Sequence, residues 1–418
     1  MRNAELKWKV ARGMTLPLTF RIPHSAFRTP HSALVFTMHH VYLHVPFCRR
    51  RCSYCDFSIA VRKRIPARDY VAAVLREVDL VLGGQRGVVP SCDGLDTLYL
   101  GGGTPSLLPP PAIAQLLDGI REKLRIPHSA FRTAEVTLEA NPEDVTPENA
   151  EQWRQAGVNR VSLGAQSFDA RVLEWMHRSH DAARIAAAVR ALRGAGIDNI
   201  SLDLIFALPV ELRRDWSRDL DLALSLLPSH LSLYGLTVEE RTPLARWISR
   251  GAATAPDDER YADEYLLAHA RLAACGYRFY EVSNAARDGR RSRHNSAYWS
   301  GRAYLGLGPA AHSFDGRARR WNTPAWDAYC RALAAGQSAV DSEEVLSDEQ
   351  RELERLYLAL RTAEGLALSD LPRPSPSFPV WVEQGWATIA RGHVRLTPEG
   401  WLRLDALVRD LTGAPATG

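Results

Sequence analysis

The sequence predicts an α/β protein with a parallel β-sheet, followed by a smaller C-terminal domain. From Met38 onward, β-branched and aromatic runs alternate with amphipathic helical stretches, and repeated βα units are typical of a parallel sheet. The chain has 418 residues, more than one average domain and enough for a large core. A proline-rich break at Pro372–Pro379 interrupts the C-terminal portion.

Six strands are expected in the larger domain, with helical patterns between them. Hydrophobic periodicity separates the two, because side chains repeat every two residues in a strand and every 3.6 in a helix. The expected strands are Val41–Val45, Thr97–Leu100, Glu135–Glu139, Arg160–Leu163, Ile200–Phe206 and Leu231–Tyr234. The expected helices are Ala67–Leu82, Pro111–Leu124, Pro147–Ala156, Ala170–Met176, Ala182–Ala195, Trp216–Leu226 and Asp257–Ala274.

The C-terminal portion begins around Asp341 and has a winged-helix-like pattern. A strong helical pattern covers Glu343–Thr362, and Trp381–Ile389, Val394–Leu396 and Thr397–Leu411 read as helix, short strand and capped helix. Such a module can bind nucleic acid. Because acidic residues are interspersed with its arginines, we favour a structural lid or cofactor cover instead.

Composition narrows the class of protein. The formal net charge is only +4, so the bulk charge implies neither a polyanion nor a membrane surface as partner. No apolar run has the length of a membrane span, and no signal peptide is evident. We therefore expect a soluble, cytoplasmic protein, monomeric or homodimeric, that binds no nucleic acid.

Three cysteines spaced C-x3-C-x2-C carry the most information about chemistry. Cys48, Cys52 and Cys55 follow a strand-like run, and their thiolates could bind three irons of a [4Fe–4S] cluster while leaving the fourth iron open. A zinc site would need His44 or Asp56 as the fourth ligand, and both lie too close in sequence to close a tetrahedron easily. A disulfide would leave one thiol over, and nothing else in the chain suggests an oxidising compartment.

This cysteine motif, with the aromatic Tyr54 before its last cysteine, resembles the radical S-adenosylmethionine (SAM) superfamily. More narrowly, Tyr42-x-His44-x-Pro-Phe-Cys48 followed by Cys55-Asp-Phe57 is similar to the oxygen-independent coproporphyrinogen III dehydrogenases and their haem-chaperone relatives of the HemW type. The resemblance implies that SAM chelates the open iron. It also implies a partial (β/α)6 barrel with its chemistry in the loops at the carboxyl ends of the strands.

Several further residues match the positions at which the family binds SAM. Without the resemblance, the glycine run at 101–103 could be a tight turn, and Glu139 could be a helix cap or salt-bridge partner. Asp203 lies in an apolar strand, where an unpaired acid is costly. Arg178 could pair with the SAM carboxylate in a bidentate fork. The residues implied for SAM are Tyr42, Tyr54, Phe57, Gly102, Gly103, Thr104, Glu139, Gln166, Arg178 and Asp203.

A second motif, His294-Asn295-Ser-Ala-Tyr298-Trp299, matches the H-N-x-x-Y-W sequence that the HemW-type chaperones use in binding haem. A neutral imidazole is a good axial ligand for haem iron, and the faces of Tyr298 and Trp299 could cover a porphyrin. The alternative to a role as haem ligand is that His294 is a hydrogen-bonded core residue. His312 is a second candidate for the axial ligand.

The porphyrinogen-oxidising relatives carry a further cysteine where this chain has Phe57, and they have an N-terminal substrate-binding extension that this chain does not resemble. We therefore expect a haem chaperone that binds a [4Fe–4S] cluster, SAM and haem, with an electron donor and a haem-acceptor protein as partners. The alternative is a coproporphyrinogen III dehydrogenase. A plain electron-transfer protein would need neither the open iron nor the residues implied for SAM.

The first 37 residues look foreign to the rest of the chain. Arg21–Thr29 recurs letter for letter at Arg125–Thr133, and a repeat without a structural period is not typical of a solenoid. We expect residues 1–37 to be a non-native or disordered leader with the natural start at Met38, and the second copy to extend a surface loop. The remaining divisions are then 38–275 for the barrel, 276–340 for a connecting segment and 341–418 for the C-terminal domain.

Overall fold

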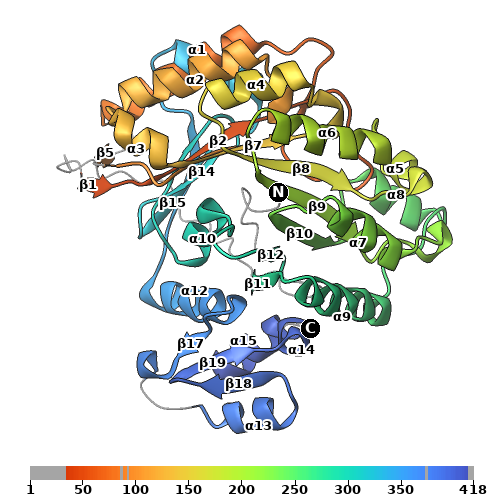
Figure 1. Cartoon of the computed structure of the whole chain (residues 1–418). Coiled ribbons are helices and arrows are strands. Elements are labelled where there is room, and N and C mark those ends of the chain that lie inside the picture. The colour runs from red at the N-terminus through yellow and green to blue at the C-terminus, as the bar shows by residue number, and fades with distance from the viewer. Residues whose placement is uncertain (1–33, 85–87, 92–93, 372–374, 413–418) are drawn as a thin grey trace.

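The computed structural model describes residues 34–84, 88–91, 94–371 and 375–412. A curved central sheet is covered on its outer side by helices, and a small α/β unit lies below the sheet (Figure 1). The helix α10, Arg293–Trp299, lies between the sheet and the long helix α12, Asp348–Arg361. The predicted fold class, a partial barrel with a small C-terminal domain, is confirmed.

The described residues contain a nine-stranded sheet in the order β11-β12-β10-β9-β8-β7-β6-β2-β13. All six predicted strands are present and pair in parallel, in chain order. Their bounds are β2 His40–Val45, β6 Thr97–Gly102, β7 Glu135–Ala140, β8 Arg160–Gln166, β9 Asn199–Phe206 and β10 His230–Gly235. Different strands form the two edges of the sheet, so the barrel is open, as expected for six βα units.

Helices cover the sheet between these strands, close to the predicted bounds. They are α1 Ala67–Leu82, α2 Pro110–Lys123, α4 Pro147–Gln155, α5 Ala170–Trp175, α6 Ala182–Gly194, α7 Trp216–Ser225 and α9 Asp258–Ala274. Side-chain caps begin several of them: Thr146 accepts from the Asn149 N–H, and Asp181, Asp215 and Asp257 cap α6, α7 and α9. Short 3-10 turns lie at Pro105–Leu107, Pro142–Asp144, Val210–Leu212 and Leu368–Asp370.

The helix α8, Pro243–Ser249, was not predicted. The repeated segment at 125–133 was expected to be a loop, and this is wrong, because His128–Thr133 forms the short helix α3. None of the α3 residues is buried, in keeping with the expected surface position. The first copy of the repeat and most of the proposed leader, residues 1–33, lie outside the described residues. Leu34–Thr37 forms β1, which pairs with β5, Val88–Ser91.

Along the barrel strands, polar and aliphatic residues alternate. Val41 and Leu43 of β2, for example, belong to the hydrophobic core shared with the helices. On the opposite face, the intervening side chains bond to one another across strands, as His40 does to Thr97 and Ser162 to Asp203. The sheet therefore encloses a polar lumen within an aliphatic shell, and this lumen contains Tyr42, Glu139 and Asp203 among the residues implied for SAM.

The segment after β10 joins the main sheet. The strands β11 Arg278–Glu281 and β12 Asn284–Ala286 extend it antiparallel at one edge, and β13 Leu305–Leu307 pairs in parallel with β2 at the other. The expected boundary at residue 275 thus divides strands of one sheet. Between β12 and β13, Ser292 caps α10 by accepting from the Asn295 N–H at 3.3 Å.

The predicted helix over Glu343–Thr362 begins too early. Residues Val340–Val345 form β16, which pairs with β15, Ala318–Asn322, and β14, His312–Phe314, completes that sheet. Helix α12 begins only after Ser347, which forms a capping box with Gln350. The strand alternates half-buried and exposed residues, but its sequence, VDSEEV, shows no matching alternation of apolar and polar residues.

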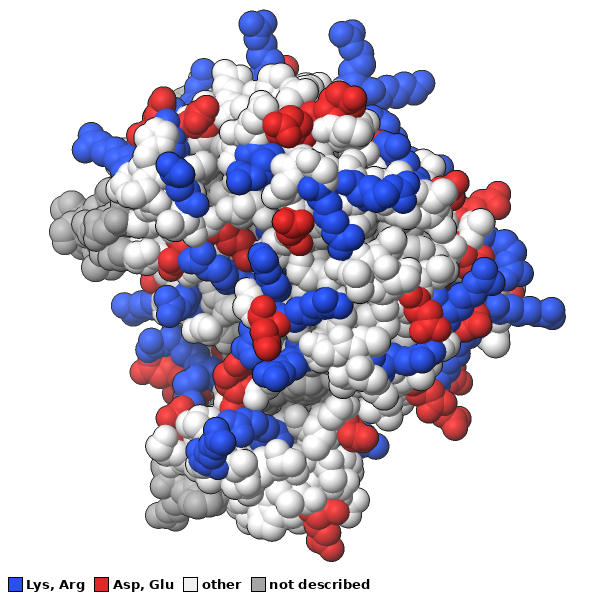
Figure 2. Space-filling view, viewed as in Figure 1, with Lys and Arg blue, Asp and Glu red and all other residues white. Residues whose placement is uncertain are grey.

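The remaining C-terminal elements match the winged-helix-like prediction in outline, but the helix expected over Trp381–Ile389 is wrong in its second half. The helix in this region ends at Glu383, and residues 387–389 belong to a strand that pairs with the one predicted at Val394–Leu396. The strands β17 Leu366–Ala367, β19 His393–Leu396 and β18 Ala387–Ala390 form a three-stranded antiparallel sheet. The helices of this unit are α13 Ser377–Glu383, α14 Pro398–Trp401 and α15 Leu404–Thr412, whereas α11, Trp326–Ala334, packs on α1 of the barrel. On the face shown in Figure 2, basic and acidic side chains are interspersed. None of the described helices is both long and apolar enough to cross a membrane.

Candidate radical SAM site

The three cysteines lie on the loop that follows β2, at the carboxyl end of the barrel strands. The loop begins with the short strand β3, Phe47–Cys48, which pairs with β4, Ala60–Val61. The Ser53 N–H donates to the carbonyl of Met176 at 3.3 Å, and the Ser53 carbonyl accepts from the Leu244 N–H at 2.9 Å. Residues that follow α5 and begin α8 therefore hold the middle of the loop in place.

All three thiols are free and interact electrostatically with one another. Burial raises the pKa of Cys48 to about 11 and that of Cys55 to about 12, so neither ionises readily without a positive partner. Thr104 Oγ1 lies 3.4 Å from the Cys48 sulfur, and Arg178 Nη1 lies 3.7 Å from the Cys52 sulfur. The iron atoms of a cluster could supply the missing positive charge.

A mononuclear zinc site fits these residues less well. The imidazole of His44 is engaged at both nitrogens, because Nε2 donates to the Ser58 carbonyl at 3.2 Å and Nδ1 accepts from the Tyr42 hydroxyl at 3.2 Å. Among the described residues, no group of three or more His, Cys, Asp or Glu side chains is placed to hold a single metal ion. A cubane cluster differs, since each thiolate binds its own iron.

The glycine run packs directly against the start of the cysteine loop. Gly102 has φ +115°, and a Cβ there would lie 2.8 Å from the His44 ring. A Cβ on Gly103 would lie 2.8 Å from the carbonyl oxygens of Pro46 and Phe47. Side chains at these positions would push the two loops apart, so the glycines keep the backbone of the second strand beside the cysteines.

Glu139 projects into the lumen from β7 and is 2% exposed. Its carboxylate accepts from the Gly102 N–H at 3.0 Å and from the Tyr99 hydroxyl at 2.9 Å. Burial raises the pKa of Glu139 to about 8. A cationic group entering the lumen would therefore find a carboxyl whose charge it could stabilise, and the amino group of SAM has this character.

Arg178 lies between the cysteine loop and β8. Its Nη2 donates to Asn141 Oδ1 at 2.6 Å and to the Gly164 carbonyl at 2.9 Å, while its Nε is buried without a hydrogen-bond partner. Burial alone would lower the pKa of Arg178, but the charges of Tyr54, Cys52 and Glu143 outweigh it and raise the pKa. The cation is thus fixed beside the cluster loop with an N–H still to be satisfied.

The other residues implied for SAM take different positions around the same opening. Gln166 ends β8 with φ 68°, a left-handed conformation that is uncommon outside glycine. Asp203 is 1% exposed and accepts from the hydroxyls of Ser162 and Ser201, so the predicted pairing of this acid is present. Tyr54, like Trp175 and Trp247, packs on an apolar cluster that includes Val172 and Met176. Phe57 is half-buried.

The H-N-x-x-Y-W motif forms α10 and closes the amino-terminal end of the lumen, opposite the cysteine loop. His294 is 1% exposed, and both of its ring nitrogens are engaged, Nδ1 with Thr97 Oγ1 at 2.6 Å and Nε2 with the Tyr298 hydroxyl at 2.8 Å. Burial lowers the pKa of His294 well below its usual range. In this conformation His294 is a buried, hydrogen-bonded histidine, the alternative that the sequence left open.

The other motif residues are buried as well. Asn295 is 6% exposed. Tyr298 and Trp299 belong to a cluster with Tyr304, Phe314, Leu346 and Leu358. The Arg361 guanidinium of α12 lies 4.2 Å from the centre of a Trp299 ring and is paired with Glu281 at 2.7 Å. The aromatic faces are thus covered by α12. His312 is half-buried, with its ring stacked on Trp321.

Comparison with known proteins agrees with this geometry. Residues 42–223 match the model of the radical SAM superfamily. The chain is 39% identical to Heme chaperone HemW of Mycobacterium tuberculosis (strain ATCC 25618 / H37Rv) over 89% of its own length and 94% of that relative. It belongs to the HemW family. To the HemW proteins of Escherichia coli (strain K12) and Bacillus subtilis (strain 168) it is 34% identical, covering 96% and 85% of them.

The fold of this HemW-family chain is also that of a solved enzyme. Coproporphyrinogen III oxidase (HemN) from Escherichia coli superposes with a TM-score of 0.73 at 20% identity, covering 91% of both chains. At that identity the likeness shows the fold alone. The expected resemblance is thereby confirmed, and membership of the radical SAM superfamily implies a [4Fe–4S] cluster and SAM.

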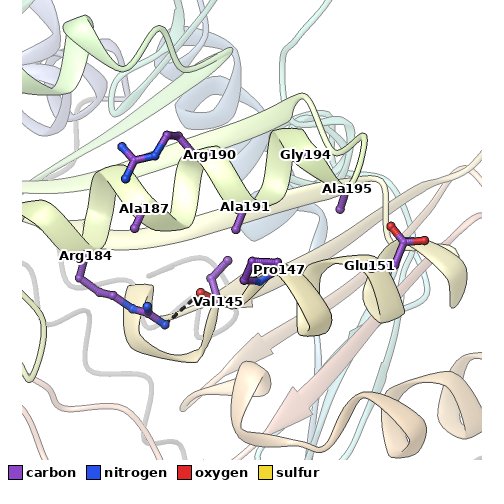
Figure 3. Close-up of a pocket in the computed structure, with 9 residues that line it drawn as sticks. All are labelled: Val145, Pro147, Glu151, Arg184, Ala187, Arg190, Ala191, Gly194 and Ala195. Atoms are coloured by element: carbon purple, nitrogen blue, oxygen red, sulfur yellow. Dashed lines mark hydrogen bonds between the residues drawn. The ribbon is translucent and has the colours of Figure 1, made fainter.

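Sequence reasoning missed two residues at the site of this HemW-family chain, Tyr99 and Asn141, although both lie next to motifs that it used. Tyr99 is two residues before Gly101, so strand alternation places both on the lumen side, and Asn141 follows Glu139 in the same way. A cavity of about 530 Å³ between α4 and α6 is unrelated to the site (Figure 3). The guanidinium of Arg184, which lines this cavity, donates to backbone carbonyls, including that of Val145.

Proposed function

We propose that this chain is a haem chaperone, which binds haem and delivers it to an acceptor protein. The observation that carries the proposal is the 39% identity over 94% of a relative named Heme chaperone HemW. The complete H-N-x-x-Y-W motif supports it. The cluster would sit on Cys48, Cys52 and Cys55, with SAM on its open iron.

The residues proposed for SAM surround the carboxyl end of the lumen. Glu139 would pair with the amino group, because a cation would stabilise the charge of its buried carboxyl. Arg178 would pair with the carboxylate, because its guanidinium lies beside Cys52 and its Nε has no hydrogen-bond partner. Thr104 lies beside the Cys48 sulfur. The backbone of the glycine run would form another side of the SAM site. The other residues proposed to bind SAM are Tyr42, Tyr54, Phe57, Gly102, Gly103, Gln166 and Asp203.

Haem is proposed to bind at α10, with His294 as axial ligand and with Asn295, Tyr298 and Trp299 around it. Two changes must accompany binding. The Tyr298 hydroxyl must release Nε2 of His294, and α12 must move away from the aromatic faces that it covers. Haem uptake would then require partial separation of the C-terminal domain, in agreement with the sequence-based expectation of a cofactor cover.

The proposed cluster and haem chemistry also indicate which partners the protein needs and in which compartment it works. A cluster that reduces SAM needs an electron donor, and a chaperone needs a haem acceptor. The free cysteines fit a reducing compartment, and we propose the cytoplasm. Coproporphyrinogen III oxidation remains the alternative activity, but the HemN likeness reaches only the fold.

The decisive experiment compares two incubations of protein with a reconstituted cluster. One contains haem followed by an apo-haemoprotein acceptor, and the other contains coproporphyrinogen III, SAM and reductant. Stable haem uptake and transfer without porphyrinogen turnover would support the chaperone. Decarboxylation of coproporphyrinogen III without haem transfer would replace it with the enzyme.

A further inference from the structure

The lumen contains a continuous series of contacts between the two ends of the barrel. At the carboxyl end, the carboxylate of Glu139 has two donors, the Gly102 N–H and the Tyr99 hydroxyl. Removing either donor would free one carboxylate oxygen to turn. Tyr99 therefore sets the direction in which Glu139 faces a ligand.

The ring of Tyr99 continues the series toward the amino-terminal end. It stacks on the His294 imidazole with centroids 5.0 Å apart and planes 27° apart. Tyr42 stacks on both partners, 6.1 Å from Tyr99 and 6.3 Å from His294. All three side chains are at most 6% exposed, so no solvent layer separates the motif histidine from the tyrosine that orients Glu139.

His294 is in turn fixed by the strands and by its own helix. Thr97 Oγ1 bonds to Nδ1, the Tyr298 hydroxyl bonds to Nε2, and the His294 N–H donates to Glu135 Oε1 at 3.2 Å. Because protein interiors are close-packed, a displacement of α10 or of the His294 ring cannot occur without movement of Tyr99.

We infer that His294 and Tyr99 are positioning residues for the SAM site. Through them, a change in the position of α10 alters the orientation of the Glu139 carboxylate. The inference rests on the proposed role of Glu139 and does not depend on haem binding. Linkage makes the effect reciprocal: a ligand that displaces His294 changes the affinity for SAM, and SAM changes the affinity of α10 for that ligand by the same factor.

The test is SAM affinity, measured by titrating the EPR signal of the reduced cluster in reconstituted full-length protein. Tyr99→Phe keeps the stacked ring and removes the donor to Glu139, and should weaken SAM binding about tenfold. His294→Ala removes the stacked partner and should weaken it roughly fivefold. In the double variant, His294→Ala should add nothing, because the hydroxyl through which it acts is already absent.

His230 supplies a matched control. It is also fully buried in the lumen, with Nδ1 bonded to Ser201 Oγ at 2.8 Å and Nε2 bonded to the Tyr280 hydroxyl at 2.8 Å. Within the described lumen, neither ring nitrogen of His230 bonds to Tyr99 or Glu139. Among the described hydrogen bonds, His230 is linked to the proposed SAM residues only through Ser201, which donates to Asp203. His230→Ala should therefore reduce stability about as much as His294→Ala does, yet weaken SAM binding clearly less.

Three results would overturn the inference. Wild-type SAM affinity in His294→Ala would show that α10 does not reach Glu139, and independent, multiplying effects of the two substitutions would show that Tyr99 is not the link. Unchanged affinity in Glu139→Gln would remove the proposed SAM site itself and the inference with it. If His294→Ala does not accumulate, His294→Gln retains a polar group without the aromatic face, and the same outcomes decide.

Discussion

Arg178 Nη1 lies 3.7 Å from the sulfur of Cys52, so the cation proposed for the SAM carboxylate lies beside the cluster loop. Asn141 and the Gly164 carbonyl hold the other end of the guanidinium. A ligand on the open iron would meet a charge whose orientation is already fixed, which reduces the entropy lost on binding.

Arg178→Ala should therefore leave the cluster in place and weaken SAM binding by about 2 kcal/mol or more, since it removes a charged hydrogen-bond donor. The cluster's EPR signal, titrated with SAM, measures the loss. Arg184→Ala is the control, because Arg184 also bonds to backbone carbonyls, of Pro142, Glu143 and Val145, but lies on the outer face. Equal SAM affinity in both variants would mean that Arg178 is structural.

Replacing any one of Cys48, Cys52 or Cys55 by Ala should abolish the brown chromophore and the bound iron and sulfide, because each thiolate holds a separate iron. Cys275 and Cys330 lie outside the loop, and their Ala variants should keep full iron content. Cys92 lies outside the described residues. Full iron content in Cys52→Ala would disprove the assignment of the cluster.

The barrel could be predicted well because polar and aliphatic residues alternate along its strands and capped helices separate these strands. The same periodicity failed at Val340–Val345, where acidic residues on an exposed edge strand carry no aliphatic alternation, and at His128–Thr133, a helix without a buried face. Both elements depend on contacts with other segments or on local turns, which single-sequence periodicity does not register.

The motifs indicated which residues line the carboxyl end of the barrel, but not their partners. Nothing in the sequence indicated that Tyr99 joins Glu139 to His294, since that contact depends on how α10 closes the lumen. The sequence also could not predict that Arg361 covers Trp299, because these two residues meet only through tertiary packing.

The buried carboxyl of Glu139 should make stability depend on pH. Its pKa is about 8 in the folded chain against the ordinary 4.5. Between these values the folded state retains a proton that the unfolded state has lost, so stability falls as pH rises through this window. Chemical denaturation of cluster-free protein at pH 5.5 and pH 8 should show a smaller fall in Glu139→Gln, by on the order of a few kcal/mol.

Glu151→Gln on the exposed face of α4 is the control for this measurement, and it should follow the wild-type pH dependence. If Glu139→Gln lost stability with pH as steeply as the wild-type protein, the carboxyl would be ionised in the folded lumen. A partner that stabilises its charge would then have to be sought.

His294→Ala should shift or erase the Soret band of the haem complex without loss of iron or sulfide from the cluster, because none of the cluster cysteines lies on α10. Trp299→Ala should weaken haem binding less, since it removes apolar cover and no iron bond. His312→Ala distinguishes the ligands: if it alone abolishes the haem spectrum, the axial ligand is His312. Haem spectra unchanged in all three variants would place the site elsewhere.

Helix α12 covers the aromatic side of the haem motif through Arg361. Among the described contacts, Arg361 is the residue of α12 that both packs on Trp299 and pairs with Glu281. Glu281 has no exposed side-chain surface, so Arg361→Ala leaves a buried charge unpaired, at a cost of about 3–5 kcal/mol.

Arg361→Ala removes both the ion pair of α12 with Glu281 of β11 and its contact with Trp299 of α10. Helix α12 should therefore separate from this region more readily, and haem uptake should become faster, as stopped-flow absorbance can measure. Arg355→Ala is the matched control from the same helix. Its pairs with Glu352 and Asp370 are solvent-exposed, where such bridges contribute ~0–1 kcal/mol, and its uptake rate should equal that of the wild-type protein. A folded Arg361→Ala protein with the wild-type uptake rate would show that α12 does not limit access of haem to the motif.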